Sequence, residues 1–87
     1  MSTKDDISPY PIPVYDAIDL GRAIARLRRR RRWSQSDLAD WVGVHRVTVS
    51  KLEHGGTVDL PTAVRALAIL GARLTIEPRA RAEPPHG

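Results

Sequence analysis

The chain has 87 residues, enough for one small domain, and its lack of cysteine excludes disulfide bonds and thiolate metal sites. Its formal net charge is +4, and half of its 14 Lys and Arg residues are arginines between Arg22 and Arg32. This charge favours an anionic partner, nucleic acid before a membrane. No apolar run approaches the roughly 20 residues of a membrane span, and the first 13 residues lack the apolar core of a signal peptide. We therefore expect a soluble cytoplasmic protein, associated with the nucleoid and not with a membrane.

Residues 1–15 are predicted to form an extended arm, because the prolines at positions 9, 11 and 13 disfavour helix. Within this arm, residues 10–15 could form a short edge strand. A first helix is predicted from Ala17 to Arg31, with Asp16 as its N-cap. Its apolar stripe consists of Leu20, Ile24 and Leu27. Arginines occupy the other faces, so this helix combines an inner apolar side with a basic surface.

Two short helices joined by a tight turn come next. Ser34 opens the second helix, and an aspartate three residues later completes a variant of the capping box. Gly43 ends this helix in a left-handed turn, and the third helix runs to His54 from either His45 or Arg46. The inward-facing residues of the two helices are Leu38, Ala39, Val42, Val49 and Leu52. This pattern predicts a helix-turn-helix.

A fourth helix is predicted after its N-cap Asp59, with Pro61 in the first turn, where proline is tolerated. Gly71 ends it. Its apolar positions are Val64, Leu67, Ala68 and Leu70. These positions are expected to close the core of the domain.

The C-terminal part begins with an alternating pattern over residues 73–77, which predicts a short strand closed by a proline. Residues 16–77 are therefore expected to form the folded domain. Residues 78–87 are polar and rich in proline, and we expect a disordered tail.

The third helix has the side chains that read base edges in a major groove. Its outward positions are Arg46, Val47, Thr48, Ser50 and Lys51. Arg46 and Lys51 can each address O6 and N7 of guanine, and Val47 and the Thr48 methyl can contact a thymine methyl group. We expect these five residues to carry base readout.

Phosphate contacts are expected around the start of the second helix, where backbone amides point outward. The predicted phosphate-binding residues are Arg28, Arg32, Ser34, Gln35 and His45. The arginine run from 28 to 32 can be a phosphate-binding strip or a solvated helix face. We expect at least two of its arginines to touch phosphate.

Several segments carry a family resemblance: Leu27-Arg28, Trp33-Ser34-Gln35, Leu38-Ala39, Val42-Gly43-Val44 and Val49 to Gly55. Over roughly residues 20–70 they resemble the Cro/phage-repressor (XRE) helix-turn-helix family. The resemblance implies a mostly α, lambda-repressor-like bundle of four helices. It also implies that Arg28 pairs with Glu53, in what we expect to be a partly buried, bidentate salt bridge that fixes the recognition helix against the first helix.

The flanking segments DLGRAIARLR and LGARLTIEP resemble HipB-like antitoxins of type II toxin–antitoxin operons. In that group the strand after the last helix pairs with its counterpart in a second subunit. The dimer strand here consists of Arg73, Leu74, Thr75 and Ile76. A lone strand leaves its backbone groups unpaired and so needs a partner strand. The same strand of a second copy is the simplest partner, and residues 10–15 are the competing one. The resemblance implies a homodimer on a palindromic DNA operator, and a HipA-like kinase toxin as a candidate partner.

Three positions depart from the family pattern. Arg32 stands where glycine usually ends the first helix, so a corner that is strained or shaped differently is expected. His45 replaces the usual Ser or Thr cap and is a poor cap, which leaves the start of the third helix open or gives His45 a phosphate contact. Trp41 occupies a normally polar, outward position, where it is either an anchor for a protein interface or a partly exposed packing residue. Trp33, in contrast, is expected in the core.

The sequence contains no arrangement typical of catalysis or of metal or cofactor binding, so we expect a protein that is not an enzyme and has no cofactor. The function predicted is a sequence-specific transcriptional repressor, the antitoxin that autoregulates a HipBA-like operon. Two alternatives remain open. One is a protein-interaction module that mainly neutralises a toxin, and the other is a stand-alone phage-type repressor or restriction–modification controller.

Overall fold

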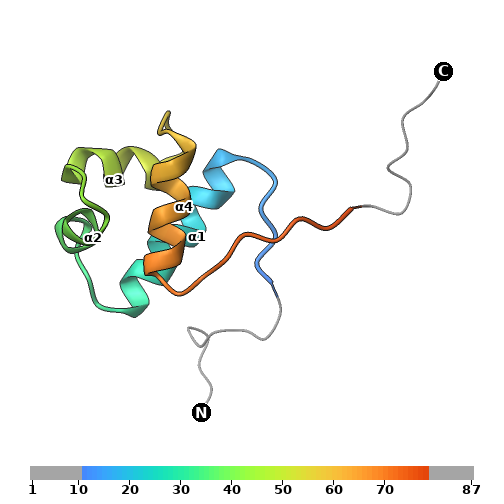
Figure 1. The fold of residues 1–87 in the computed structure, drawn as a ribbon, viewed down its shortest axis with the longest axis horizontal. Coiled ribbons are helices and arrows are strands. Elements are labelled where there is room, and N and C mark those ends of the chain that lie inside the picture. Colours follow the sequence, from blue (N-terminus) through green and yellow to red (C-terminus); the bar gives the residue numbers. More distant parts are fainter. Residues whose placement is uncertain (1–10, 79–87) are drawn as a thin grey trace, which may run out of the picture.

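The computed structural model describes residues 11–78, which form four α-helices (Figure 1). They are α1 (Ala17–Arg30), α2 (Gln35–Val42), α3 (Arg46–Glu53) and α4 (Leu60–Ile69). Helix α3 packs against both α1 and α2, and α4 packs against α2. The helical bundle predicted from the sequence is confirmed. Most of the predicted arm and of the predicted tail lies outside the described residues.

The helix starts follow the local capping chemistry. The Asp16 side chain accepts the amide of Asp19 at 2.8 Å and so begins α1. Ser34 and Asp37 form a full capping box at the start of α2, in which each side chain accepts the other residue's backbone N–H. At the start of α4 the side chain of Asp59 accepts the Thr62 amide at 3.0 Å. These N-caps are all where the sequence predicts them.

The turn between α2 and α3 also matches the prediction. Gly43 has φ +86°, a left-handed conformation that a side chain disfavours. His45 precedes α3 without any side-chain hydrogen bond to the helix. Helix α3 therefore begins at Arg46, and its first turn has no side-chain cap from His45.

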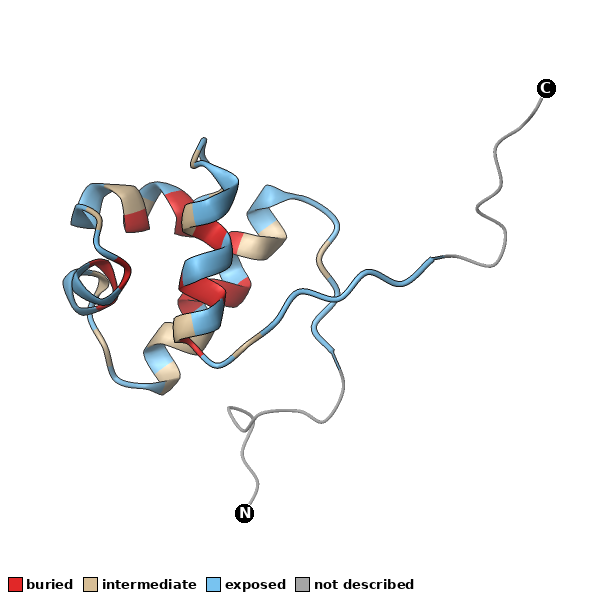
Figure 2. Ribbon diagram, in the orientation of Figure 1, coloured by how far each residue is buried: buried red, intermediate tan, exposed pale blue. Residues whose placement is uncertain are grey.

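The core lies between the four helices, where buried positions face inward (Figure 2). Its buried members are Ile24, Leu38, Ala39, Val42, Val49, Leu52, Ala63, Ala66, Leu67 and Leu70. The assignment of Val64 and Ala68 to the inner face of α4 is wrong, because both are exposed. Ala63 and Ala66 lie inside instead, since they continue the i, i+3, i+4, i+7 stripe of Leu67 and Leu70.

The prediction that Trp33 is a core residue is wrong. Trp33 is half-buried and packs against the edge of the core. Its ring stacks on that of Trp41, with centroids 5.8 Å apart and planes inclined by 14°. The indole is therefore divided between the core and an aromatic pair on the surface.

Helices α1 and α3 approach each other closely at Gly21. A β-carbon at this position would meet the Leu52 carbonyl oxygen and would lie 2.5 Å from that of Glu53. Both obstacles are backbone atoms, so they cannot move aside as a flexible side chain would. The absence of a side chain at Gly21 thus sets the spacing between α1 and the end of α3.

No strand is present between residues 11 and 78, so neither the C-terminal strand nor the competing strand at residues 10–15 is found in the part of the chain that the structure describes. Residues 73–78 run as exposed, extended chain. A strand needs a neighbouring strand to complete its hydrogen bonds, and one copy of the chain offers none here. The pairing of residues 73–76 across a dimer therefore remains a proposal.

The corner between α1 and α2 is strained at the predicted residue. Arg32 has φ +60°, and it is the one non-glycine residue with positive φ in the described range. This left-handed conformation brings Cβ too close to the following carbonyl oxygen. The arginine that replaces a helix-ending glycine therefore adopts the conformation that glycine would adopt freely.

We expect Arg32→Gly to stabilise the protein by roughly 0.5–1 kcal/mol, since relief of the strain exceeds the added entropy of the unfolded chain. The melting temperature should rise by several degrees. Arg31→Gly is the control, because it removes the same charge from a residue with φ −88° that has no strain to relieve, and it also removes the contact with Trp33, so it should not stabilise. A melting temperature of Arg32→Gly at or below the wild-type value would contradict this account.

Candidate nucleic-acid interface

Helix α3 presents a polar face outward while Val49 and Leu52 are buried. Three of the predicted base-reading residues, Arg46, Val47 and Lys51, are exposed. The other two, Thr48 and Ser50, are half-buried. The exposed set combines two cations with one apolar side chain, which suits guanine edges and thymine methyl groups.

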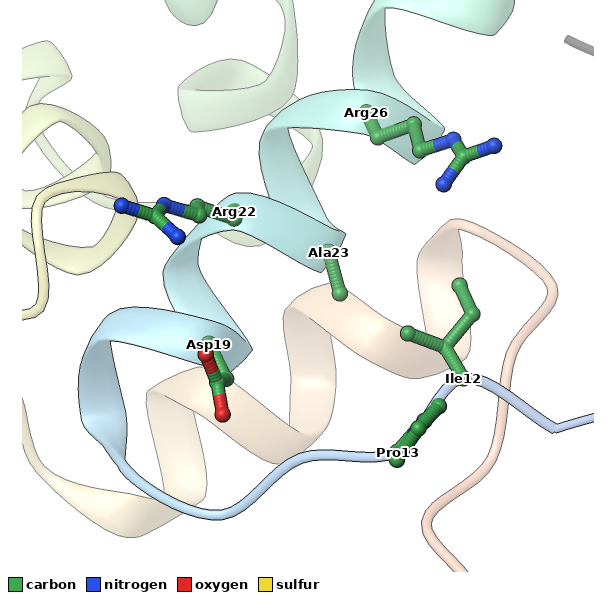
Figure 3. Close-up of a pocket in the computed structure, with 6 residues that line it drawn as sticks. All are labelled: Ile12, Pro13, Asp19, Arg22, Ala23 and Arg26. Atoms are coloured by element: carbon green, nitrogen blue, oxygen red, sulfur yellow. The ribbon is translucent and has the colours of Figure 1, made fainter.

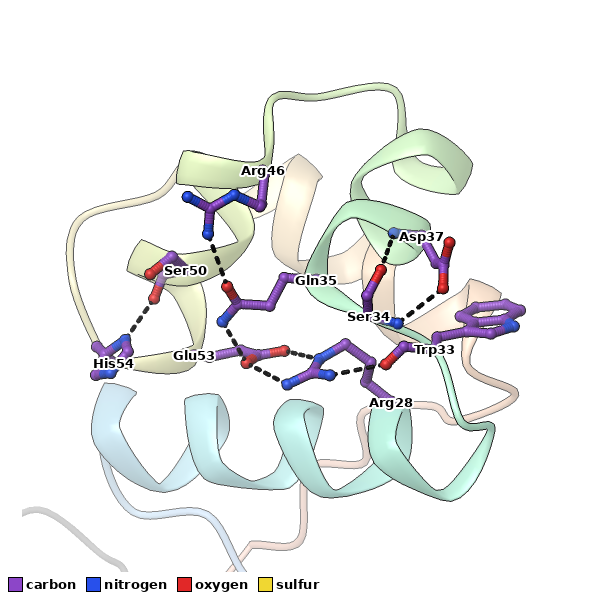
Figure 4. Close-up of polar contacts among 9 residues, drawn as sticks. All are labelled: Arg28, Trp33, Ser34, Gln35, Asp37, Arg46, Ser50, Glu53 and His54. Carbon is purple, nitrogen blue, oxygen red and sulfur yellow. Dashed lines mark hydrogen bonds and ion pairs between the residues drawn. The ribbon is translucent and has the colours of Figure 1, made fainter.

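The predicted pair of Arg28 and Glu53 is present and bidentate (Figure 4). Arg28 Nε donates to Glu53 Oε2 at 2.6 Å, and Nη2 donates to Oε1 at 3.0 Å. Nη1 donates to the carbonyl oxygen of Trp33 at 2.8 Å. One side chain of α1 therefore holds both the end of α3 and the segment that leads into α2.

Gln35 extends this network to the recognition helix. Its Nε2 donates to Glu53 Oε1 at 3.0 Å, and its Oε1 accepts from Arg46 Nη1 at 3.3 Å (Figure 4). A continuous chain of hydrogen bonds thus runs from Arg28 through Glu53 and Gln35 to Arg46. Sequence reasoning did not find this link, since no local pattern relates residues 11 and 18 positions apart.

Glu53 is the one charged residue that is buried in the described range. Burial by itself would raise its pKa, but the hydrogen bonds from Arg28 and Gln35 and the charges of Arg28 and Arg29 outweigh burial and lower the pKa below 4.5. Glu53 is therefore a carboxylate at neutral pH, and it accepts two bonds from Arg28 and one from Gln35.

The predicted phosphate-binding residues differ in their surroundings. Arg32, Ser34 and His45 are exposed. Gln35 is half-buried and engaged in the network, whereas Arg28 uses three of its five N–H groups on Glu53 and Trp33. Arg28 thus has a structural role and keeps two N–H groups for a further acceptor.

Trp41 is 64% exposed on the outer side of α2. The ring of Trp41 stacks on that of Trp33. The guanidinium group of Arg31 also lies on Trp33, and its carbon is 5.1 Å from the centroid of the Trp33 ring. A cation–π contact of this kind holds the aromatic pair in one orientation. Trp41 is therefore an exposed but ordered aromatic surface.

Residues 11–78 contain no group of three His, Cys, Asp or Glu side chains that could hold a metal ion. Over the same residues no helix is both long and apolar enough to cross a membrane.

Comparison with known proteins agrees with this geometry. The model of a family described as "Helix-turn-helix domain" matches residues 19–81. The chain belongs to the helix-turn-helix domain family. Within it, this helix-turn-helix protein is 37% identical over 51 residues to the competence pilus inhibition repressor of Acinetobacter baylyi. That match covers 59% of the chain but only 46% of the repressor, so the chain spans about half the length of that relative.

Solved structures place this helix-turn-helix protein near HipB. A chain in the structure of a HipA-HipB-O2-O3 complex superposes with a TM-score of 0.67 at 28% identity, covering 74% of this chain and 92% of that one. A chain in a HipB-O4 20mer complex gives a TM-score of 0.69 at 27% identity, covering 79% and 97%. The protein is thus a HipB-like helix-turn-helix protein of the Cro/phage-repressor type.

We expect Arg28→Ala to destabilise the fold by about 3 kcal/mol at neutral pH, because Glu53 would remain buried without its main partner. The wild-type contribution of Glu53 is complete above its ordinary pKa of 4.5 and is lost as the pH falls through its lowered folded value. In the variant, burial would raise the pKa instead. The deficit of the variant should therefore be largest at pH 7 and should shrink towards pH 4.

Urea unfolding at several pH values measures this deficit. Arg28→Lys is the matched variant, since it keeps the charge without the bidentate geometry and should lose less stability. A deficit that does not change with pH would show that the buried carboxylate is not its cause. Unchanged stability with weaker DNA binding would instead make Arg28 a phosphate contact.

Proposed function

We propose that this protein is a sequence-specific DNA-binding repressor of transcription. The observation that carries the proposal is the network of Arg28, Glu53 and Gln35, which holds Arg46 at the exposed start of α3. A fixed guanidinium at this end of the helix is suited to bidentate contact with guanine in the major groove. Membership of the helix-turn-helix family supports the same use.

In this proposal α3 enters the major groove. Val47 and Lys51 are exposed on this helix and would face the bases. The start of α2 at Ser34 then faces the DNA backbone, because the first amides of a helix attract phosphate. The exposed side chains of Arg32 and His45 are further candidates for contacts with backbone phosphates. Affinity should fall steeply with salt, since phosphate contacts dominate it.

We further propose that two copies bind a palindromic operator as a homodimer. Residues 73–76 leave the domain in an extended conformation, and the Leu74 and Ile76 side chains are exposed. Pairing of this segment with its copy would satisfy the backbone and cover both apolar side chains. The two recognition helices would then reach half-sites about 34 Å apart.

The most specific form of the proposal is an antitoxin that represses its own operon and binds a HipA-like kinase toxin. It is supported by the similarity to a chain in the HipA-HipB-O2-O3 complex. The exposed ring of Trp41 is our candidate anchor for this protein interface, because Trp33 and Arg31 hold it in place. A stand-alone regulator is the second candidate, since a relative is named a competence pilus inhibition repressor.

Base readout is tested by Arg46→Ala and Lys51→Ala, assayed against a duplex that footprinting identifies upstream of the gene. Each should reduce discrimination between this duplex and a scrambled one by about 10- to 100-fold, the effect of one lost bidentate base contact. Arg26→Ala is the control, because it removes one charge from α1 and should leave discrimination unchanged. Retained discrimination in both α3 variants would exclude this helix as the reader.

Dimerisation is tested by two truncations compared by sedimentation. Removing residues 73–87 should convert the dimer to a monomer, while leaving Ala72, which packs against the core, in place. Removing residues 79–87 alone should leave the dimer intact and serves as the control. If the protein that lacks residues 73–87 still sediments as a dimer, pairing through residues 73–76 is rejected.

A further inference from the structure

A hollow of about 310 Å³ lies between α1 and the end of α3. It is lined by Arg22, Ala25, Arg28, Arg29, Gln35, Glu53 and His54. Figure 4 shows four of these residues, Arg28, Gln35, Glu53 and His54, between the two helices. Ala25 is buried and small, so it leaves space on α1 between the longer side chains of Arg22 and Arg29.

The hollow carries excess positive charge. The charge of Glu53 is matched by Arg28, with which it forms the one ion pair in residues 11–78. Arg22 and Arg29 then remain without a carboxylate partner within those residues, and both are exposed. They lie seven positions apart and so project from the same side of α1, two turns from each other.

The same hollow adjoins the surface that we propose to face DNA. Gln35 lines it and also bonds to Arg46 of the recognition helix. His54 forms another wall, where its Nδ1 lies 2.8 Å from the Ser50 carbonyl oxygen. Because a carbonyl oxygen only accepts, Nδ1 carries the proton and the ring is tied to the end of α3.

We propose that Arg22 and Arg29 form a phosphate-binding subsite, which holds the DNA backbone beside the bases read by α3. The ligand is a phosphodiester of double-stranded DNA. Arg22 is not among the residues that the sequence pattern assigns to phosphate binding, whereas Arg29 belongs to the arginine run from 28 to 32, of which at least two are expected to touch phosphate. The subsite rests on the proposed function and adds Arg22 as a further phosphate contact from α1.

The chemistry favours a polymer over a small free anion. Two exposed guanidinium groups bind a single phosphate weakly in water, since solvent screens their charge. On DNA the same groups displace condensed counterions, which makes each contact favourable at low salt. Arginine also forms paired hydrogen bonds with phosphate oxygens.

The chain provides a matched control in Arg26. It lies on α1 between the two proposed ligands and does not line their hollow, but lines a second one with Ile12 and Pro13, to which Arg22 also contributes. Figure 3 shows Arg22 and Arg26 extending to opposite sides of α1. Arg26→Ala therefore removes the same charge from the same helix without touching the subsite.

The test measures how the binding constant for the footprinted duplex and for a scrambled duplex depends on salt, using the full chain. Arg22→Ala and Arg29→Ala should each reduce the slope of log K against log salt concentration by about 0.9, the value for one lost phosphate contact. The loss should be equal on both duplexes, because phosphate carries no base sequence. Arg26→Ala should leave the slope at the wild-type value.

Two further arms separate the outcomes. Arg22→Glu should weaken binding more than Arg22→Ala, since it places a negative charge beside phosphate, and thermal unfolding checks that each variant is folded. Inorganic phosphate, titrated at constant ionic strength, should not saturate the site. Saturable binding that the Arg22→Ala/Arg29→Ala variant loses, with an unchanged slope on DNA, would assign the hollow to a free anion and overturn the proposal.

Failure of the subsite is distinct from failure of the proposed function. If the wild-type protein discriminates its duplex but both alanine variants behave like Arg26→Ala, the subsite is wrong and base readout by α3 stands. If the wild-type protein binds no duplex, the proposed function fails first, and the subsite fails with it.

Discussion

The structure depends on one buried ion pair, between Arg28 of α1 and Glu53 at the end of α3. Glu53 lies where the backbone of α3 comes close to α1, because Gly21 has no side chain to obstruct it. Such a pair adds little net stability, because desolvation offsets the attraction. The consequence of the pair is geometric. If the pair breaks, Glu53 is a buried charge without a partner, so the pair favours the placement of α1 and α3 that keeps it intact.

Two functional features follow from this placement. Gln35 can reach both Glu53 and Arg46, so the first turn of α3 is joined to α1 through α2. The single negative charge of Glu53 balances that of Arg28, so the charges of Arg22 and Arg29 in the same hollow are not neutralised. These two arginines are the ones that we propose to bind phosphate. A single buried acid thus both orients the proposed reading residue and leaves the surface around it positive.

The corner between α1 and α2 shows a different balance. Arg32 keeps an unfavourable left-handed backbone, whereas glycine would adopt it without strain. Its neighbours Arg31 and Trp33 form an ordered stack with Trp41 on the surface of α2. The strain is small compared with the stability of a domain, and the corner carries an aromatic ring that is exposed at the surface.

The sequence by itself determined the local features of this protein. The caps at Asp16, Ser34 and Asp59 and the left-handed turn at Gly43 depend on residues within one helical turn, so patterns of neighbours predict them. The pairing of Arg28 with Glu53 is a long-range contact, and only the family resemblance made it predictable.

Tertiary structure decided the rest. The inward side of α4 depends on how the helix packs against α2, which turned Ala63 and Ala66 inside and Val64 outside. The link through Gln35 and the basic hollow join residues from separate helices, whose distances no sequence spacing specifies. Pairing of residues 73–76 depends on a second chain, because a strand completes its hydrogen bonds only with a neighbour.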